Sequence, residues 1–194
     1  MVDVQAGIPA GTEKKAAELY WEAFGAKLGR VMGPRDKALA YINRVLDPTH
    51  ALSAVAPDGT LLGVVGFKTN KSALVGGTFE DMAAIYGAFG ATWRGLLVSL
   101  LERDTENERF LMDGIFVAPE ARGQGVGSAL LHAIMEEART RGYASVRLDV
   151  IDTNPRARAL YERHGFEPHN TSHLGVLKPV FRFGSATTMV RQLT

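Results

Sequence analysis

Apolar positions recur at helical spacing near the start of the chain. One stripe runs from Thr12, which can act as an N-cap, to Leu28, and a second begins at Pro34 and ends before Pro48. Each stripe predicts an amphipathic helix, so two helices should precede the first strong strand signal.

Two apolar runs then follow at residues 51–56 and 61–67, on either side of Pro57-Asp58-Gly59. Because Asp and Gly tolerate positive φ in tight turns, this pattern predicts an antiparallel hairpin. Short strands are also expected over residues 2–8 and 187–193.

The second half of the chain reads as strand, helix and strand. Residues 110–117 form a compact apolar run that Pro119 closes, residues 125–141 carry a continuous helical stripe, and residues 145–150 alternate. This order predicts a right-handed crossover between two parallel strands. Asn154-Pro155 should then begin a further helix that ends near Gly165.

Residues 70–108 are irregular, with a Gly76-Gly77 break and two helical stretches. The stronger stretch has an apolar stripe of Trp93, Leu96, Leu97, Leu100 and Leu101. No linker rich in Pro, Gly or Ser divides the chain. We therefore expect a single domain over residues 1–194 with a helical insertion at 70–108.

The composition excludes several classes of function. The chain has 194 residues, 46% of them hydrophobic, and 22 basic against 21 acidic side chains, which gives a net charge of +1. No broad field attracts nucleic acid or an anionic membrane. The absence of cysteine excludes disulfides and thiolate metal sites. With no leader pattern at the N-terminus, we expect an unprocessed cytoplasmic protein.

A glycine-rich loop, Arg122-Gly123-Gln124-Gly125-Val126-Gly127, lies between the strand at 110–117 and the following helix. Backbone N–H groups at a helix N-terminus bind anions. No Gly-Lys-Ser/Thr follows, as a P-loop requires, and Ser128 replaces the last glycine of the dinucleotide fingerprint. The loop therefore indicates another phosphate ligand or, alternatively, a tight turn without a ligand.

The loop resembles the GNAT acetyltransferase superfamily, whose pattern Arg/Gln-x-x-Gly-x-Gly/Ala is matched by Arg122, Gly125 and Gly127. A second family pattern, Asn-x-x-Ala-x-x-Leu-Tyr-x-x-x-Gly-Phe, is matched between Asn154 and Phe166. The resemblance covers about residues 108–168. It implies an α/β (α+β) fold with a mixed, mostly antiparallel sheet, a parallel β-α-β crossover at the loop and flanking helices.

The resemblance also implies acetyl-CoA (coenzyme A) as the cofactor and transfer of its acetyl group to a primary amine. The strand before the loop would bind the pantetheine arm, and the loop would bind the pyrophosphate. The implied cofactor-binding residues are Ile115, Phe116, Val117, Arg122, Gly123, Gln124, Gly125, Val126, Gly127, Ser128, Asn154 and Tyr161. Asn154 could contact the cofactor, cap its helix, or do both.

Two residues are candidates for proton transfer. Tyr161 occupies the family position for the acid that serves the leaving thiolate, or it is an aromatic packed on the sheet. Asp113 is the candidate base, because strict alternation puts it on one strand face with Ile115 and Val117. As alternatives, a water could relay the proton, or Asp113 could be a strand-edge carboxylate that pairs with a basic side chain on the surface.

The acceptor stays open between a small-molecule amine and a peptide or protein amine. The two leading helices, the insertion and residues 172–184 should shape its pocket. The apolar stripe of the insertion could face the core, line this pocket or support a homodimer. A catalytically silent acyl-CoA sensor and a nucleotide-binding module are the rival functions. We expect no metal site at His164, His169 and His173. The basic turn of Arg156, Arg158 and Arg163 could touch the adenosine 3′-phosphate of coenzyme A, but charged helix faces are usually solvated, and we expect that outcome here.

Overall fold

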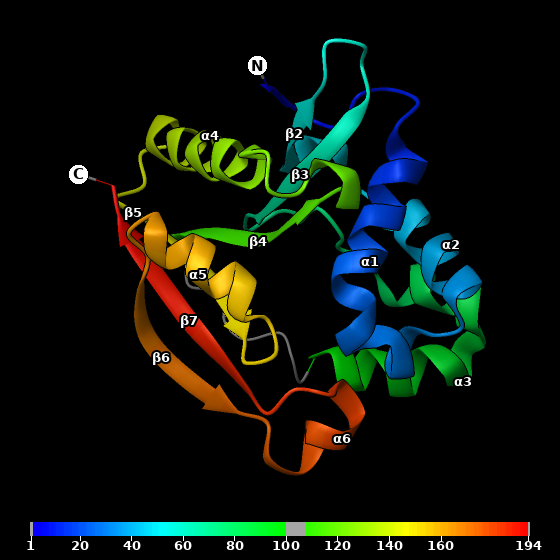
Figure 1. Ribbon diagram of the computed structural model, residues 1–194. Coiled ribbons are helices and arrows are strands. Elements are labelled where there is room, and N and C mark those ends of the chain that lie inside the picture. Colours follow the sequence, from blue (N-terminus) through cyan, green and yellow to red (C-terminus); the bar gives the residue numbers. More distant parts are fainter. Residues whose placement is uncertain (1, 100–107, 194) are drawn as a thin grey trace.

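A computed structural model describes residues 2–99 and 108–193 of the chain (Figure 1). Seven strands form one sheet in the order β1-β2-β3-β4-β5-β7-β6. The strands are β1 (Asp3–Ala6), β2 (Ala51–Val55), β3 (Leu61–Lys68), β4 (Phe110–Val117), β5 (Ser145–Ile151), β6 (Glu167–His173) and β7 (Ser185–Gln192). Neighbouring strands are antiparallel except β4 and β5, which are parallel. The mixed, mostly antiparallel fold predicted from the sequence is confirmed.

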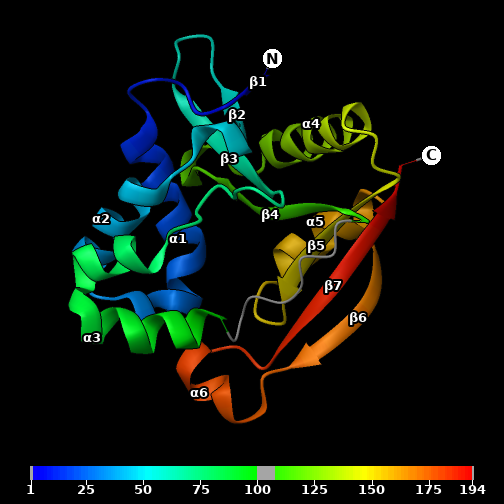
Figure 2. The same ribbon diagram turned by 180° about the vertical axis from the view of Figure 1, so that it is seen from behind.

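The helices are α1 (Glu13–Met32), α2 (Arg35–Val45), α3 (Phe79–Ser99), α4 (Val126–Thr140), α5 (Pro155–Arg163) and α6 (Lys178–Phe181). Three short 3-10 turns lie at η1 (Pro48–His50), η2 (Pro119–Ala121) and η3 (Gly175–Leu177). The helices α1, α2 and α3 gather on one side of the molecule, and α4 and α5 lie on the other, as both views show (Figures 1 and 2).

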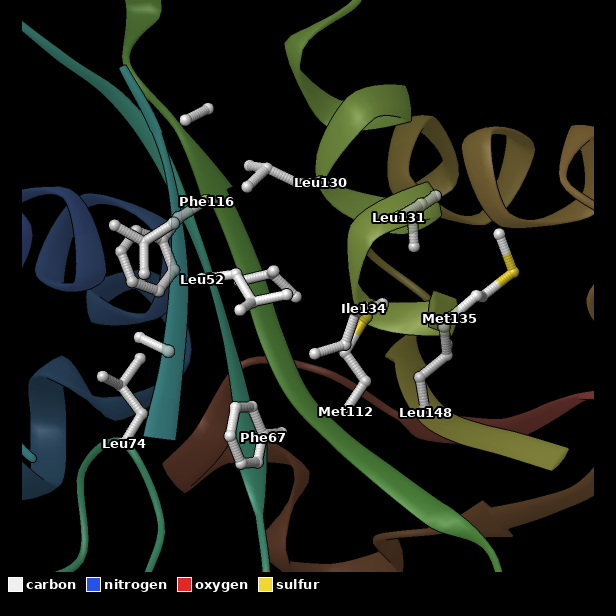
Figure 3. Packing of buried hydrophobic residues seen from close by; sticks show 14 of the residues in the cluster. Leu52, Phe67, Leu74, Met112, Phe116, Leu130, Leu131, Ile134, Met135 and Leu148 are labelled. Carbon is white, nitrogen blue, oxygen red and sulfur yellow. The ribbon is translucent and has the colours of Figure 1, made fainter. Parts of the chain in front are cut away.

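Helices α1 and α4 cover opposite faces of the sheet at β3 and β4. A Cβ built on Gly63 would meet Leu130 of α4, whereas one on Gly114 would meet Phe24 of α1. Gly114 pairs with Gly66, which points to the face opposite Gly63 because side chains alternate along β3. The α4 face holds the larger core, in which the leucines and Ile134 of α4 pack over β4 and β5 (Figure 3).

β4 and β5 pair over a short distance and then separate. Within the described chain they share two register positions, Phe110 with Val146 and Leu111 with Arg147. β4 nevertheless continues to Val117 along β3, and β5 continues to Ile151 along β7. Beyond Leu111, the edge of β4 that faces β5 therefore borders a split in the sheet.

The structure departs from the expected elements in the helices. α1 runs on to Met32 because Val31 and Met32 are buried in a second core among α1, α2 and α3. Thr12 is the N-cap residue, but its hydroxyl donates to the carbonyl of Pro9 and does not cap the helix. The two helical stretches expected in 70–108 meet as α3 across a kink at Gly87, where φ is 72°.

The apolar stripe expected in the insertion faces the core only in part. Leu96 is 65% exposed, so the core-facing alternative fails for this residue, while Trp93 and Leu97 do pack against the second core. Leu100 and Leu101 of that stripe lie outside the described residues, as do residues 102–107 of the expected insertion.

Candidate active site

The glycine loop joins β4 to α4 and exposes its backbone. Gly123 and Gly125 adopt φ of 80° and 83°, a conformation that L side chains rarely take, and a Cβ at either position would meet no atom within 4 Å. Gly125 is the N-cap of α4, and no side chain caps the helix there. The first-turn N–H groups of a 15-residue helix are therefore directed at an open cradle that suits a phosphate.

This cradle is one end of a cavity of about 550 Å³. It is bounded by the end of β4, the glycine loop and α5. Nine of the predicted cofactor residues line it: Ile115, Phe116, Val117, Arg122, Gly123, Gly125, Gly127, Ser128 and Asn154. The structure therefore brings most of the predicted cofactor set around one space.

Three predicted residues contribute less than expected to this cavity. The side chain of Val126 is buried in the core, and the Gln124 amide donates to the carbonyl of Glu120 at 2.7 Å. The ring of Phe116 packs on Tyr20 and Phe24 of α1. Any cofactor contact from these three residues would have to come from the backbone.

Asn154 begins α5 and serves as its cap. Its side-chain oxygen accepts the N–H of Ala157 at 3.1 Å, which leaves the amide nitrogen to donate into the cavity. Arg156 and Arg163 also line this cavity, although the sequence assigned them to a solvated helix face. Arg158 fits that expectation, because it pairs with Glu162 at 2.9 Å. Helical periodicity places Arg156 and Arg163 on a different side of the helix from Arg158. It does not show which side borders the glycine loop, so the sequence alone could not make this distinction.

A β-bulge at Asp113 changes the face of β4. Met112 lies opposite Phe67 and Gly114 lies opposite Gly66, so Asp113 is an extra residue between two consecutive pairs. Met112 and Ile115 consequently point to the same face, although they are three residues apart. The expectation that Asp113, Ile115 and Val117 share one face is therefore wrong, because strict alternation holds only without a bulge.

The bulge turns Asp113 toward α1. Burial, the largest influence, raises the pKa of Tyr20 and lowers that of Lys27, both on α1, and the charge of Asp113 acts on each of the two groups in the upward direction. Ile115 pairs with Val65 and Val117 pairs with Gly63, on the face that α4 covers. Figure 3 shows Met112 directed toward α4 and Phe116 directed away from it.

A second cavity of about 460 Å³ adjoins the first at the split between β4 and β5. The two cavities share Ala23, Ile115, Asn154 and Ala157 in their linings. Asp113 and Tyr161 both line the second cavity. The structure thus brings the predicted base and the predicted acid together across the split.

Tyr161 is well suited to hold a proton. Its side chain is 5% exposed and its ring centroid lies 6.0 Å from that of Phe166. Burial raises the pKa of Tyr161 well above its usual value of 10.0. The phenol therefore stays protonated at neutral pH and can donate a hydrogen bond.

Three charged residues of the second cavity were missed by the sequence analysis: Lys27, Arg147 and Asp149. Lys27 comes from α1 and lies over the ring of Phe24, with its Nζ 4.6 Å from the ring centroid. Nη2 of Arg147 lies 3.8 Å from Oδ2 of Asp149. No local motif marks these residues, because elements distant in sequence bring them together.

The chain matches the family model described as Acetyltransferase (GNAT) family over residues 14–166. The chain belongs to the GNAT family of acetyltransferases. GNAT relatives include the thialysine N-epsilon-acetyltransferase of Bos taurus, 35% identical over 75 residues, which are 39% of this chain and 37% of the bovine protein. The acetyltransferase Atu2258 of Agrobacterium fabrum is 32% identical over 113 residues, 58% of this chain and 68% of that protein.

The fold agrees with solved structures of GNAT-type acetyltransferases. A Corynebacterium glutamicum structure described as histone acetyltransferase HPA2 and related acetyltransferase has a TM-score of 0.68 and 19% identity. The match covers 98% of this chain and 96% of that one. At this identity the likeness concerns the fold alone. Among the helices within residues 2–99 and 108–193, none has the length and apolar character needed to cross a membrane.

Proposed function

We propose that this GNAT protein is an acetyl-CoA-dependent N-acetyltransferase that transfers the acetyl group to a primary amine by direct attack in a ternary complex. The observation that carries the proposal is the continuity of the two cavities through the split in the sheet. One cavity ends at the glycine cradle, and the other contains Asp113 and Tyr161. A long ligand with an anionic end and a reactive end fits this arrangement.

The cofactor would be held along its length by this chain. The first turn of α4 and the arginines Arg122, Arg156 and Arg163 would bind its phosphates, and the β5-facing edge of β4 would bind the pantetheine arm. When bound, coenzyme A would supply the acetyl group as an activated thioester. The open cradle at Gly123 and Gly125 supports this fit, because no side chain fills it.

Asp113 and Tyr161 divide the proton transfers between the two faces of the sheet. The Asp113 carboxylate, on the α1 side, would accept the proton that the attacking amine loses, directly or through a water. The Tyr161 hydroxyl would donate a proton to the departing sulfur as the C–N bond forms and the C–S bond breaks. Asp113 then releases its proton to solvent and Tyr161 regains one, which balances the reaction.

The acceptor side is formed by α1, β5 and the segment that contains α6. The bovine relative is named for an acceptor amine on thialysine, which supports an amine acceptor here. We further propose that residues 1–194 act as one acetyltransferase domain and that the protein works in the cytoplasm. None of the described residues of the insertion, 70–99 and 108, lines the second cavity, so the expectation that the insertion shapes the acceptor pocket is not supported there. A homodimer through the insertion is an additional proposal.

A thiol-release assay with acetyl-CoA and a panel of amines tests the proposal. Tyr161→Phe should lower kcat by about 100-fold, within the range of general acid–base catalysis, with little change in acetyl-CoA affinity. Tyr143→Phe is the matched control, since Tyr143 packs against Phe110 away from both cavities. Acetyl-CoA binding without thiol release on any amine would instead identify a catalytically silent sensor.

A further inference from the structure

The acceptor side of the split contains two cations and two anions. Lys27 comes from α1, Asp113 from the bulge in β4, and Arg147 and Asp149 from β5. On β5, Asp149 pairs with Thr188 of β7, whose hydroxyl donates to Oδ1 of Asp149 at 2.5 Å. Arg147 lies on the same face as Asp149, because the two are two residues apart in the strand. These four charges surround the space that the acceptor must enter.

The surroundings of Lys27 act on its charged form in opposite directions. Burial lowers its pKa, while the charges of Asp113 and Asp149 raise it. The ammonium group also rests on the face of the Phe24 ring, a favourable cation–π geometry. A half-buried lysine that lines the cavity and whose ammonium group lies over an aromatic ring is placed to bind an anion that enters the cavity with its own counter-charge.

The balance of charges discriminates between classes of amine. A diamine or polyamine could place positive charges near Asp113 and Asp149, but it would bring no anion to offset the charge of Lys27. A simple alkylamine would likewise bring no anion to Lys27. An acceptor that carries both an amine and a carboxylate keeps the site neutral, because each of its charges meets one of opposite sign.

We propose that the acceptor is a small amine that also carries a carboxylate, and that Lys27 binds this carboxylate while Asp113 serves the reacting amine. This inference rests on the proposed acetyltransferase function. The cavity volume of about 460 Å³ falls within the range of about 300–1,000 Å³ typical of small-molecule sites. Phe24, Leu174 and Phe183 supply an apolar wall for the carbon chain between the two charged groups.

Matched pairs of amines test the inference directly. Lysine is compared with 1,5-diaminopentane, and ornithine with 1,4-diaminobutane, so that each pair differs by the carboxylate alone. The measured quantity is the ratio of kcat/KM within each pair. In the unmodified protein the carboxylated member should be favoured by about 10- to 100-fold, the size expected for a hydrogen bond to a charged group.

Variants of Lys27 assign the preference to that side chain. Lys27→Met should bring the ratio close to one, whereas Lys27→Arg, which keeps the charge, should retain most of it. Lys14→Met is the control, since Lys14 is an exposed residue of α1 outside the cavity. Acetyl-CoA affinity measured by calorimetry establishes that each variant is folded. The ratio of kcat/KM within an amine pair is measured on one protein preparation, so it does not depend on the fraction of active protein.

The outcomes separate the two proposals. Equal rates for both members of a pair, or a ratio that Lys27→Met leaves unchanged, would overturn the inference while the acetyltransferase proposal stands. If acetyl-CoA binds but no thiol is released in the presence of the four amines or of a wider amine panel, the acetyltransferase proposal itself would be overturned. Loss of the ratio in Lys27→Met and its retention in Lys27→Arg would support the inference.

Discussion

The Nε2 atom of His164 lies 2.9 Å from the hydroxyl oxygen of Ser128. His164 is the C-cap of α5, and Ser128 lies in the first turn of α4, so this contact joins the two helices beside the glycine loop. Burial lowers the pKa of His164, and the nearby His132, Arg191 and Arg163 lower it further. The imidazole is therefore neutral at neutral pH, with one ring nitrogen committed to the serine hydroxyl.

His164→Ala should weaken acetyl-CoA binding, because Ser128 would lose the contact that orients it beside the cradle. The expected increase in Kd is about 3- to 10-fold, which corresponds to one net hydrogen bond. Calorimetric titration with acetyl-CoA measures it. His169→Ala, at an exposed position of β6, is the control. Equal affinity in the two variants would show that the His164 contact does not support the cradle.

The arginines of α5 should differ in their effect on the cofactor. Arg156→Gln and Arg163→Gln should each raise the Kd for acetyl-CoA by up to about fivefold, since an exposed ion pair contributes up to about 1 kcal/mol. Arg158→Gln should leave it unchanged, because Arg158 faces Glu162 and does not line the loop cavity. The contribution of the first two should shrink at high salt, where screening weakens exposed ion pairs. A similar loss in all three variants would argue for a general charge effect.

Gly125→Ala should destabilise the protein through backbone conformation and not through collision. Its φ is 83° and an added Cβ meets no atom within 4 Å, so the expected loss is about 1–2 kcal/mol for a left-handed L residue. Gly29→Ala is the matched control, inside α1 with no positive φ and no close neighbour. It should stabilise the fold by about 0.5–1 kcal/mol. Urea denaturation measures both, and stabilisation by Gly125→Ala would contradict the expectation.

Stability should fall at alkaline pH. Burial raises the pKa of Tyr86 to about 12, and its hydroxyl donates to the carbonyl of Met32 at 2.6 Å. Since the unfolded phenol ionises near pH 10.0, the unfolded state loses protons that the folded state retains between pH 10.0 and about 12. Stability is therefore fully present below pH 10.0 and declines through that window, to which the raised pKa values of Tyr20 and Tyr161 add.

Tyr86→Phe separates the part due to this residue. At pH 8 it should lower the free energy of unfolding by about 1 kcal/mol, the value of one hydrogen bond. Between pH 10 and 12 the free energy of unfolding should fall less steeply with pH in Tyr86→Phe than in the unmodified protein. The difference in slope should be a fraction of about 1.4 kcal/mol per pH unit, the limit for one proton. Chemical denaturation at several pH values gives both quantities. An unchanged slope would remove Tyr86 from the alkaline transition.

The sequence predicted best the parts of the fold that local chemistry determines. The bounds of β4 agree with the apolar run at 110–117, and Asn154 caps α5 as its position before Pro155 indicated. The glycine loop lies at the junction of strand and helix, as its glycines required. Each of these features depends on residues within a few positions of one another.

The features that the sequence left unseen depend on distant contacts. The bulge at Asp113 is set by the pairing of β4 with β3. Asp113-Gly114 interrupts the apolar run at 110–117, but the interruption alone does not show which residue is extra in the ladder. The α6 helix within 172–184 is stabilised by Phe181, which is buried in the core shared with α1 and α2. Lys27, Arg147 and Asp149 line one cavity although α1 and β5 are far apart in the sequence, and no spacing in the sequence encodes this arrangement.

The short joint between β4 and β5 divides the sheet into a half formed by β1, β2, β3 and β4 and a half formed by β5, β7 and β6. The glycine cradle and Asp113 belong to the first half, whereas Asp149 belongs to the second and Tyr161 packs on it. The relative position of Asp113 and Tyr161, the proposed base and acid, therefore depends on the orientation of one half against the other. Substitutions at Leu111 or Val146, which touch neither cavity, should alter turnover by rotating these halves. Under the proposed mechanism, the distance between base and acid is a property of how the two half-sheets are joined.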